Sequence, residues 1–188
     1  MTKEAVMVQS MDNFIPEIYQ ERLHNLLTSD RFAWYWNDKS VYLDSESADF
    51  ESKDYQFTHV LLREGNINSE FAESVLPLVY FFELHSDMKV KYIEKIKANL
   101  TTHINYTDED LKQCIHKDMN TNTDTKFMTI LYYVNDADGD TVIYHDEKES
   151  TFSPQKGRAI WFNADLDHRP STPVNSKRRI VVNIVVEV

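Results

Sequence analysis

The chain has 188 residues, with 31 acidic against 20 basic side chains, a net charge of −11 and a single cysteine, Cys114. This length is enough for one globular domain. The acidic balance argues against binding duplex nucleic acid or anionic lipid, because both are held chiefly by Lys and Arg. No apolar run approaches the roughly 20 residues of a bilayer span, and the first residues lack a signal peptide's apolar segment. One cysteine excludes an internal disulfide framework. We therefore expect a soluble cytoplasmic protein in a reducing compartment, without a membrane partner.

The first half of the sequence predicts two helices and one strand. Pro16 suits a first helical turn, and apolar residues then recur at helical spacing. A second helical pattern begins at Ser69 and continues through Phe82, where Pro77 is expected to kink or divide it. Between the two helices, residues 57–63 (FTHVLLR) have the composition of a strand.

The second half changes to short β-branched and aromatic runs separated by turn-rich segments. The predicted strands cover the second half of residues 89–100, then 127–134, 141–144, 150–152, 158–162 and 179–188. Several short strands without intervening helices are typical of an antiparallel barrel or a double-sheet jelly roll. We therefore expect an α+β fold: a double-stranded β-helix (jelly-roll) core with the N-terminal helices packed on one sheet.

This fold is expected to form a single domain over residues 1–188. Residues 1–88 would supply helical support and the substrate-side region, and residues 89–188 the jelly-roll core with the functional site. The last strand, RIVVNIVVEV, could pair inside the sheet or with another protomer. The sequence therefore leaves the oligomeric state open.

Three residues form the most informative chemical pattern: His116 and Asp118 in CIHKDMN, and His168 in DLDHRPSTP. Residues two apart on extended backbone point to the same side, so the first pair can share one ion. In a jelly roll a distant strand returns beside the first, which would bring His168 to the same place. Two imidazoles and one carboxylate leave positions open on the ion, as a non-haem Fe(II) oxygenase requires. The pair alone also fits chance, since the chain has seven histidines.

Six segments, in chain order, carry a family resemblance: IEKIKANL, HKD, TILYYVND, DGDT, SPQKGRAIWF and DHRPSTPVNSKRRIVVNIVV. They resemble the leading strand, HxD metal pair, YYLN-like strand, GGxT-like turn, PxxGR strand and distal histidine of one enzyme group. That group is the prolyl-4-hydroxylase-like Fe(II)/2-oxoglutarate-dependent dioxygenases. The likeness is greatest to short stand-alone members common in phage and marine genomes, so a phage-encoded protein is one expectation.

The resemblance implies that His116, Asp118 and His168 are the iron ligands. The family also places a basic residue about ten positions after the distal histidine, where it holds the far carboxylate of 2-oxoglutarate. Arginine suits this task because its planar guanidinium grips a carboxylate with two bonds. Arg178 and Arg179 both fit the spacing, but neighbouring strand residues face opposite sides, so only one can point inward. We favour Arg179, because it directly precedes the last strand.

Two further residues acquire candidate roles from the resemblance. Tyr133 matches the second tyrosine of the YYLN strand, which donates a hydrogen bond to the same carboxylate. Asn99 is a candidate for binding the iron-proximal end of the cosubstrate, although Asn at a strand end is also a common turn former. Thr141 and Trp161 are expected to serve packing. Asp138 departs from the family, since it stands where the GGxT turn has a glycine.

The resemblance implies an enzyme that uses Fe(II), 2-oxoglutarate and O2, with ascorbate as an optional reductant. It would hydroxylate a substrate C–H bond and release succinate and CO2. The substrate would be a small molecule or a peptide, and peptide prolyl groups, free amino acids, nucleobases and small metabolites all stay open. The alternative is a non-catalytic jelly-roll protein that binds or senses a ligand. Ligand binding without metal that survives His116→Ala would identify that alternative.

Overall fold

Three helices and eleven strands are found in residues 7–38, 55–105, 114–119 and 125–188, the part of the chain that the computed structural model describes. The helices are α1 (Glu17–Leu27), α2 (Ala72–Val75) and α3 (Pro77–Ser86). The strands are β1 (Val8–Met11), β2 (Tyr35–Asn37), β3 (Gln56–Arg63), β4 (Asn66–Ile67), β5 (Tyr92–Thr102), β6 (Phe127–Tyr133), β7 (Thr141–His145), β8 (Lys148–Phe152), β9 (Ala159–Asn163), β10 (His168–Pro170) and β11 (Arg178–Glu187).

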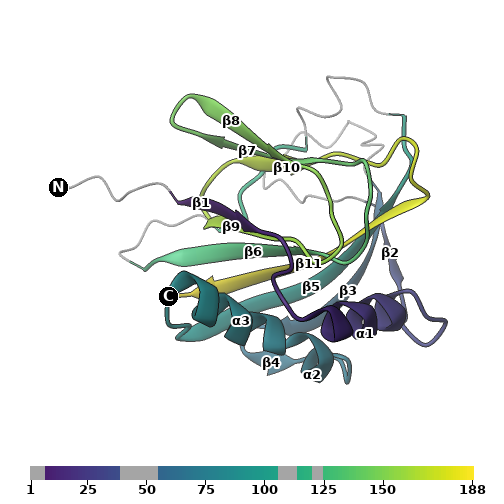
Figure 1. Cartoon of the computed structure of the whole chain (residues 1–188), viewed down its shortest axis with the longest axis horizontal. Helices are drawn as coiled ribbons and strands as arrows, with labels where there is room; N and C mark the ends of the chain where they lie inside the picture. Colours follow the sequence, from purple (N-terminus) through teal and green to yellow (C-terminus); the bar gives the residue numbers. More distant parts are fainter. Residues whose placement is uncertain (1–6, 39–54, 106–113, 120–124) are drawn as a thin grey trace.

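The strands form two antiparallel sheets. The large sheet has the order β1-β9-β6-β11-β5-β3-β2, with β4 paired to β3, and the small sheet has the order β10-β7-β8. In Figure 1 the small sheet lies over one face of the large sheet, and the helices cover the other face. This confirms the expected jelly-roll core with helices packed on one sheet.

The two longer helices, α1 and α3, start at or just after the prolines that the sequence singled out. Pro16 immediately precedes α1, and Pro77 is the first residue of α3, which it separates from α2. A proline is tolerated at the start of a helix because its missing N–H would have no partner within the helix there. None of the helices in the described part of the chain has the length and apolar character needed to cross a bilayer.

The middle strands of the large sheet bury both of their faces. On β6, Ile130 and Tyr132 join the core cluster that includes the buried residues of α1 and α3. The residues between and after them, Leu131 and Tyr133, join a second cluster with Ile143 of the small sheet. Because alternate residues of a strand point to opposite faces, odd-numbered positions of β6 face the space between the sheets. The same alternation on β5 and β11 determines which side chains can reach a site there.

The structure adds four short strands that the sequence pattern did not predict: β1, β2, β4 and β10. It also starts β5 earlier, at Tyr92. The last strand, β11, pairs with β5 on one side and β6 on the other. Both of its edges are therefore used within the chain.

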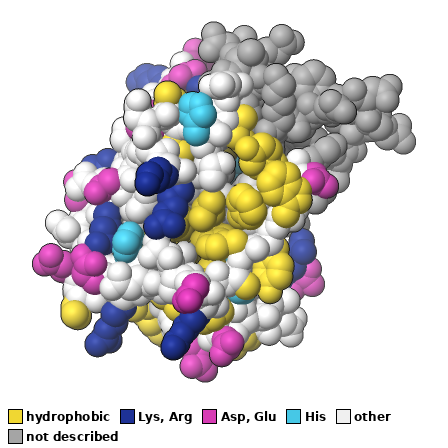
Figure 2. All heavy atoms as spheres, turned by 90° about the vertical axis from the view of Figure 1, so that its right-hand side faces the viewer, with side chains coloured by type: hydrophobic (Ala, Val, Ile, Leu, Met, Phe, Trp, Pro, Cys, Tyr) yellow, Lys and Arg dark blue, Asp and Glu magenta, His cyan; other side chains and the backbone are white. Residues whose placement is uncertain are grey.

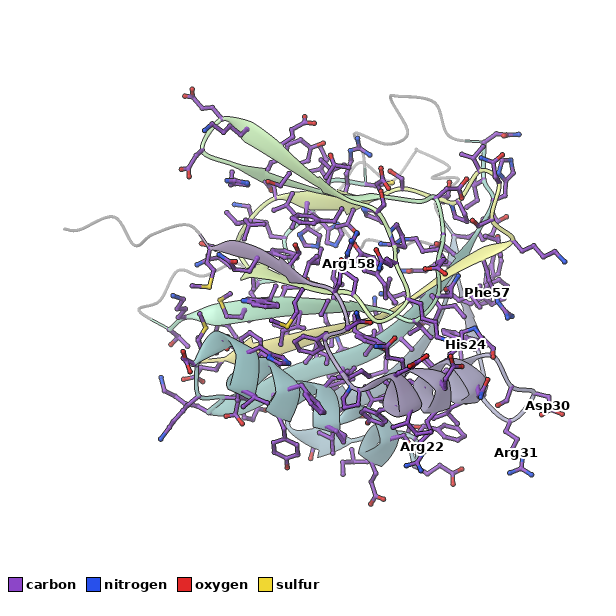
Figure 3. The ribbon with its side chains drawn as sticks, viewed as in Figure 1. Arg22, His24, Asp30, Arg31, Phe57 and Arg158 are labelled. Atoms are coloured by element: carbon purple, nitrogen blue, oxygen red, sulfur yellow. The ribbon has the colours of Figure 1, made fainter. Side chains whose placement is uncertain are left out.

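The N-terminal segment is fixed to the turn before β9. Gly157 has a φ of +81°, and a Cβ there would meet the buried side chain of Gln20 at 2.2 Å, so the position requires glycine. Its carbonyl accepts a hydrogen bond from the backbone N–H of Phe14. Arg158, labelled in Figure 3, forms an ion pair with Asp12. These contacts join the chain after β1 to the turn that leads into β9.

The opposite end of the large sheet exposes aromatic side chains. Tyr35 and Trp36 of β2 are 58% and 55% exposed, and Trp36 stacks on Tyr55. Figure 2 shows hydrophobic side chains gathered on this side of the molecule, with Lys and Arg beside them. Phe57 of β3, labelled in Figure 3, also contacts the Trp36 ring.

Candidate metal centre

His116 and His168 are brought together by the backbone. The N–H of each residue donates to the carbonyl of the other over 2.9 Å, so the chain before Asp118 forms a short bridge beside β10. Asp118 lies two residues later, and its N–H donates to the carbonyl of Ala164. The offset of two residues thus points His116 and Asp118 toward the same space, as extended backbone requires.

The three side chains converge closely enough to bind one ion. One donor atom from each of His116, Asp118 and His168 lies within 4.8 Å of the other two. Nε2 of His168 lies 3.6 Å from Oδ2 of Asp118, and the two imidazole ring centroids are 4.3 Å apart. Two imidazoles and one carboxylate are a donor set suited to Fe(II), and three protein ligands leave positions open on an octahedral ion.

Backbone contacts select which imidazole nitrogen is available. Nδ1 of His116 lies 2.9 Å from the carbonyl of Cys114, and Nδ1 of His168 lies 3.1 Å from that of Leu166. A carbonyl only accepts, so each Nδ1 carries the proton and each Nε2 keeps its lone pair for a metal. Burial, aided by the nearby His168, lowers the pKa of His116 to about 4. The ring is therefore neutral at physiological pH, the form that ligates a metal.

The carboxylate of Asp118 is fixed by three neighbours. Its side chain is 3% exposed, and Nζ of Lys95 lies 2.9 Å from Oδ1. The hydroxyl of Thr129 donates to Oδ2 over 2.8 Å, and Nδ2 of Asn183 lies 3.3 Å from both oxygens. Burial is the largest single influence and favours the neutral acid, but Lys95, His168 and His116 together outweigh it and hold the pKa of Asp118 well below its usual range. The group is thus an ionised ligand in a fixed orientation.

A cavity of about 220 Å³ extends from this triad between the two sheets. Its wall along β5 and β11 consists of the inward-facing positions Lys95, Lys97, Asn99, Thr101, Arg179, Val181 and Asn183. Asn183 touches Asp118 at one end of this wall, and Arg179 stands four residues away along β11. At about 3.3 Å per strand residue, the two positions are separated by roughly 13 Å of backbone.

The structure places the two arginine candidates differently. Arg179 lines the cavity and is only 3% exposed, whereas Arg178 is exposed. The guanidinium of Arg179 donates from Nε to the carbonyl of Gly139 and from Nη2 to the hydroxyl oxygen of Thr141, each over 2.8 Å. Among the described residues no carboxylate forms an ion pair with it. A planar guanidinium directed into a cavity has the geometry to bind a carboxylate with two bonds.

Tyr133 reaches this cation through Thr141. Its hydroxyl donates to the Thr141 oxygen over 2.7 Å, and the guanidinium of Arg179 lies 5.6 Å from the centre of its ring. Tyr133 is fully buried and does not line the cavity, whereas Thr141 does. Thr141 therefore stands between the tyrosine and the cavity, a placement that the expectation of a packing role did not anticipate.

Asn99 lies on the cavity wall between the triad and Arg179. Its Oδ1, together with Oγ1 of Thr101 and Oδ1 of Asn183, is buried without a hydrogen-bond partner in the described part of the chain. Buried polar atoms without partners are costly, so these atoms are positions where a bound molecule or water completes the hydrogen bonding.

Several residues of the site escaped the sequence analysis. Lys95, Thr129 and Asn183 hold Asp118, and their signal in the sequence is only their odd-numbered place on strands whose register was unknown. Asp138, the departure from the GGxT turn, accepts hydrogen bonds from the backbone of Val174, Asn175 and Ser176. It thereby fixes the loop that packs against Gly139, where an added Cβ would meet the Ser171 carbonyl oxygen at 2.5 Å.

One protein-family model matches the part of the chain that contains this site. The family model described as the 2OG-Fe(II) oxygenase superfamily matches residues 94–186, from within β5 to within β11. Among proteins with curated descriptions, none matches the chain.

Solved structures share the fold over nearly the whole chain. A Pseudomonas putida prolyl-4-hydroxylase is 12% identical with a TM-score of 0.62, over 97% of this chain and 93% of that one. A 2OG-Fe(II) oxygenase family oxidoreductase from Burkholderia pseudomallei is 15% identical with a TM-score of 0.66, over 96% and 85%. The epimerase SnoN in complex with Fe3+, alpha-ketoglutarate and nogalamycin RO is 9% identical with a TM-score of 0.60, over 96% and 78%.

The matched segment contains the metal triad and Arg179, and the likeness extends to enzymes that bind iron and 2-oxoglutarate. The resemblance seen in the sequence is confirmed, and Fe(II) and 2-oxoglutarate are the cofactor and cosubstrate of the family. This chain belongs to the 2OG-Fe(II) oxygenase superfamily, whose members are Fe(II)- and 2-oxoglutarate-dependent oxygenases.

Proposed function

We propose that this protein hydroxylates a C–H bond of its substrate and converts 2-oxoglutarate and O2 to succinate and CO2. One observation supports the proposal above all others. A single cavity has a candidate metal triad of two imidazoles and one carboxylate at one end, and at the other a buried guanidinium that is not ion-paired with any described carboxylate. A dicarboxylate with one end at the metal and the other at Arg179 matches both ends.

The chain's own residues would hold this dicarboxylate as follows. His116, Asp118 and His168 bind the iron, and Arg179 binds the far carboxylate. Thr141 accepts hydrogen bonds from both Arg179 and Tyr133, so its own proton is left to donate to a ligand in the cavity. Tyr133 orients Thr141 through its hydrogen bond. If the Tyr133 hydroxyl exchanges this bond for one to the far carboxylate of 2-oxoglutarate, it binds the cosubstrate directly. Asn99 lies beside the path between the two ends and binds the iron-proximal end.

Fe(II) loaded with 2-oxoglutarate and O2 supplies the oxidant, whose oxygen atoms end in succinate and in the hydroxylated product. The protein's contribution is to exclude water and to place one C–H bond of the substrate. Ile143, Leu131 and Val181 of the sheet interior form the apolar surroundings of the cavity end. Because Fe(II) must stay reduced, we place the protein in the cytoplasm, with ascorbate as an auxiliary reductant.

The substrate class that the fold favours is prolyl-hydroxylase-like, a small molecule or a peptide. The likeness to the Pseudomonas putida prolyl-4-hydroxylase supports hydroxylation. The likeness to SnoN, an epimerase, shows that the same fold also serves a different oxidative outcome. Product analysis therefore has to accompany any turnover assay.

The experiment is a succinate-release assay with Fe(II), 2-oxoglutarate and a library of amino acids, prolyl peptides, nucleosides and small metabolites. We expect succinate to form in equal amount to a product heavier by one oxygen atom, and no succinate from the His168→Ala variant. The matched control is His145→Ala, which changes an imidazole on β7 that lies outside the triad. Binding of a ligand without metal, unchanged in His116→Ala, would instead identify a non-catalytic sensor.

A further inference from the structure

Lys97 is a cavity residue that the proposed chemistry leaves unused. It points into the cavity from β5, between Lys95 and Asn99. Its cross-strand neighbours are Asn183 on β11 and Val60 on β3. Lys97 therefore lies on the cavity wall opposite Asn183, the residue that contacts Asp118.

Among the residues that the structure describes, no acidic side chain forms an ion pair with this ammonium group, and Asp118 acts on it only through its charge. Asp118 is the only carboxylate among the described residues that line the cavity, and Lys95, Thr129 and Asn183 already bind it. The structure gives Lys97 no hydrogen bond or ion pair in the described ranges. Burial, with the charge of Lys95, lowers the pKa of Lys97 to about 8, so the group is still mostly protonated at neutral pH.

The described residues that line the loaded site leave an excess of positive charge. The lining residues supply four cations, Lys95, Lys97, Lys117 and Arg179, against one carboxylate. Fe(II) and the 2-oxoglutarate dianion cancel each other. Both carboxylates of the cosubstrate have their own partners, the metal and Arg179, and Lys95 is paired with Asp118. Within the described part of the chain, Lys97 is thus a partly buried cation without a paired carboxylate, a position where an anionic group of a further ligand would supply the opposite charge.

We propose that Lys97 determines substrate specificity by binding a carboxylate or phosphate group of a small anionic substrate. This inference rests on the proposed function, because the substrate is the ligand that enters the cavity beside the cosubstrate. An ammonium group directed at an anion forms a strong charge-assisted bond. It would orient the substrate so that one of its C–H bonds faces the iron.

The test uses the full chain loaded with Fe(II) and 2-oxoglutarate without O2, titrated in a calorimeter with acetate, inorganic phosphate and neutral acetamide. The wild type is expected to bind one of the two anions and to ignore acetamide, and the preferred anion distinguishes carboxylate from phosphate. Lys97→Met should weaken that binding roughly 10- to 100-fold, and Lys97→Arg should retain most of it. Lys89→Met, which removes an exposed cation outside the cavity, is the matched control and should change nothing.

Two results separate this inference from the proposed function. If the wild type fails to bind 2-oxoglutarate in the presence of Fe(II), the proposed function is wrong. If 2-oxoglutarate binds normally but neither anion binds, or Lys97→Met binds the anion as well as the wild type does, only the role of Lys97 is wrong. A loss of 2-oxoglutarate affinity in Lys97→Met would assign the residue to the cosubstrate and overturn the proposal. The melting temperature of each variant shows whether it is folded.

Discussion

Arg179 combines burial, positive charge and the absence of a carboxylate partner in the described part of the chain. Its two hydrogen bonds to Gly139 and Thr141 orient the guanidinium, and the one described carboxylate that acts on it, Asp140, does so through its charge and not through a bond. A carboxylate that enters the cavity therefore displaces no ion-paired described carboxylate from Arg179 and gains charge-assisted bonds to a buried guanidinium. Arg178, one residue earlier, has the same charge but lies exposed.

The first prediction compares these two arginines. Arg179→Met should lower the affinity for 2-oxoglutarate by about 2 kcal/mol or more, at least ~30-fold, because a charge-assisted bond is lost. Arg178→Met should leave the affinity within about twofold, since an exposed charge contributes little. Anaerobic titration of each metal-loaded variant with 2-oxoglutarate measures both. An equal loss in the two variants would contradict the assignment of Arg179.

The second prediction concerns the effect of Lys97 on the free energy of unfolding of the ligand-free protein. Its folded-state pKa of about 8 lies below its ordinary value, so the unfolded chain binds more protons between about pH 8 and pH 10.5. The free energy of unfolding of the wild type therefore rises with pH across that window. Below pH 8 the partly buried charge of Lys97 lowers this free energy by up to about 3 kcal/mol. The groups that act on it are Lys95, Asp118 and Arg63.

Lys97→Met should therefore be more stable than the wild type at pH 7.5, and the difference should shrink toward pH 10. Urea unfolding of both proteins at the two pH values measures the free energy of unfolding. Lys89→Met again serves as the control for loss of a surface charge. A variant that is less stable than the wild type at pH 7.5 would mean that Lys97 is stabilised in the folded, ligand-free protein.

At the scale of the elements, β11 carries the site on one face and the core on the other. Asn183 faces the cavity and contacts Asp118, while the next residue, Ile184, is fully buried on the helix side. Because strand residues alternate, two adjacent substitutions test two different properties of the molecule.

We expect Ile184→Ala to lower the free energy of unfolding by about 2–5 kcal/mol, because it leaves a cavity in the core. The folded fraction should keep its metal affinity. Asn183→Ala should do the reverse, with a roughly tenfold weaker metal affinity because Asp118 loses a hydrogen bond that orients it. Denaturant unfolding and metal titration of both variants test this contrast. It fails if both substitutions act on the same property.

The strands differ in how visible they are in the sequence. The interior strands β6, β9 and β11 are buried on both faces, so they are continuous apolar runs. β1 (VQSM), β4 (NI) and β10 (HRP) are short and largely polar or contain proline, so their pairing comes from tertiary contacts. Sequence pattern cannot predict such strands, because their own residues supply little of the energy that forms them.

The site was predictable to the extent that its residues belong to recurring motifs. The triad and the arginine pair were visible because the family spaces them regularly. Lys95, Lys97, Thr129 and Asn183 lie in the segments that resemble the family, but the resemblance gave them no role, and their placement depends on the register between β5, β6 and β11. Thr141 was assigned to packing because a threonine on a strand ordinarily serves there.

At the scale of the whole molecule, net charge and local charge have opposite signs. The chain carries a charge of −11, yet the described lining of the cavity has four cations against one carboxylate. The overall charge therefore argues against polyanions that contact a wide surface, while the enclosed cavity favours a small anion. Gln56 of β3 lines the cavity together with residues of β5 and β11, so the N-terminal part of the chain also contributes to its wall.

The central claim is that His116, Asp118 and His168 hold one Fe(II) with positions left open for 2-oxoglutarate. The most direct measurement is an anaerobic titration of the protein with Fe(II), followed by 2-oxoglutarate, read by the charge-transfer absorption of the ternary complex. We predict one Fe(II) per chain, an absorption band that appears only when both are present, and no band in Asp118→Ala. Binding of 2-oxoglutarate with equal affinity in the absence of metal, or an undiminished band in Asp118→Ala, would contradict the account.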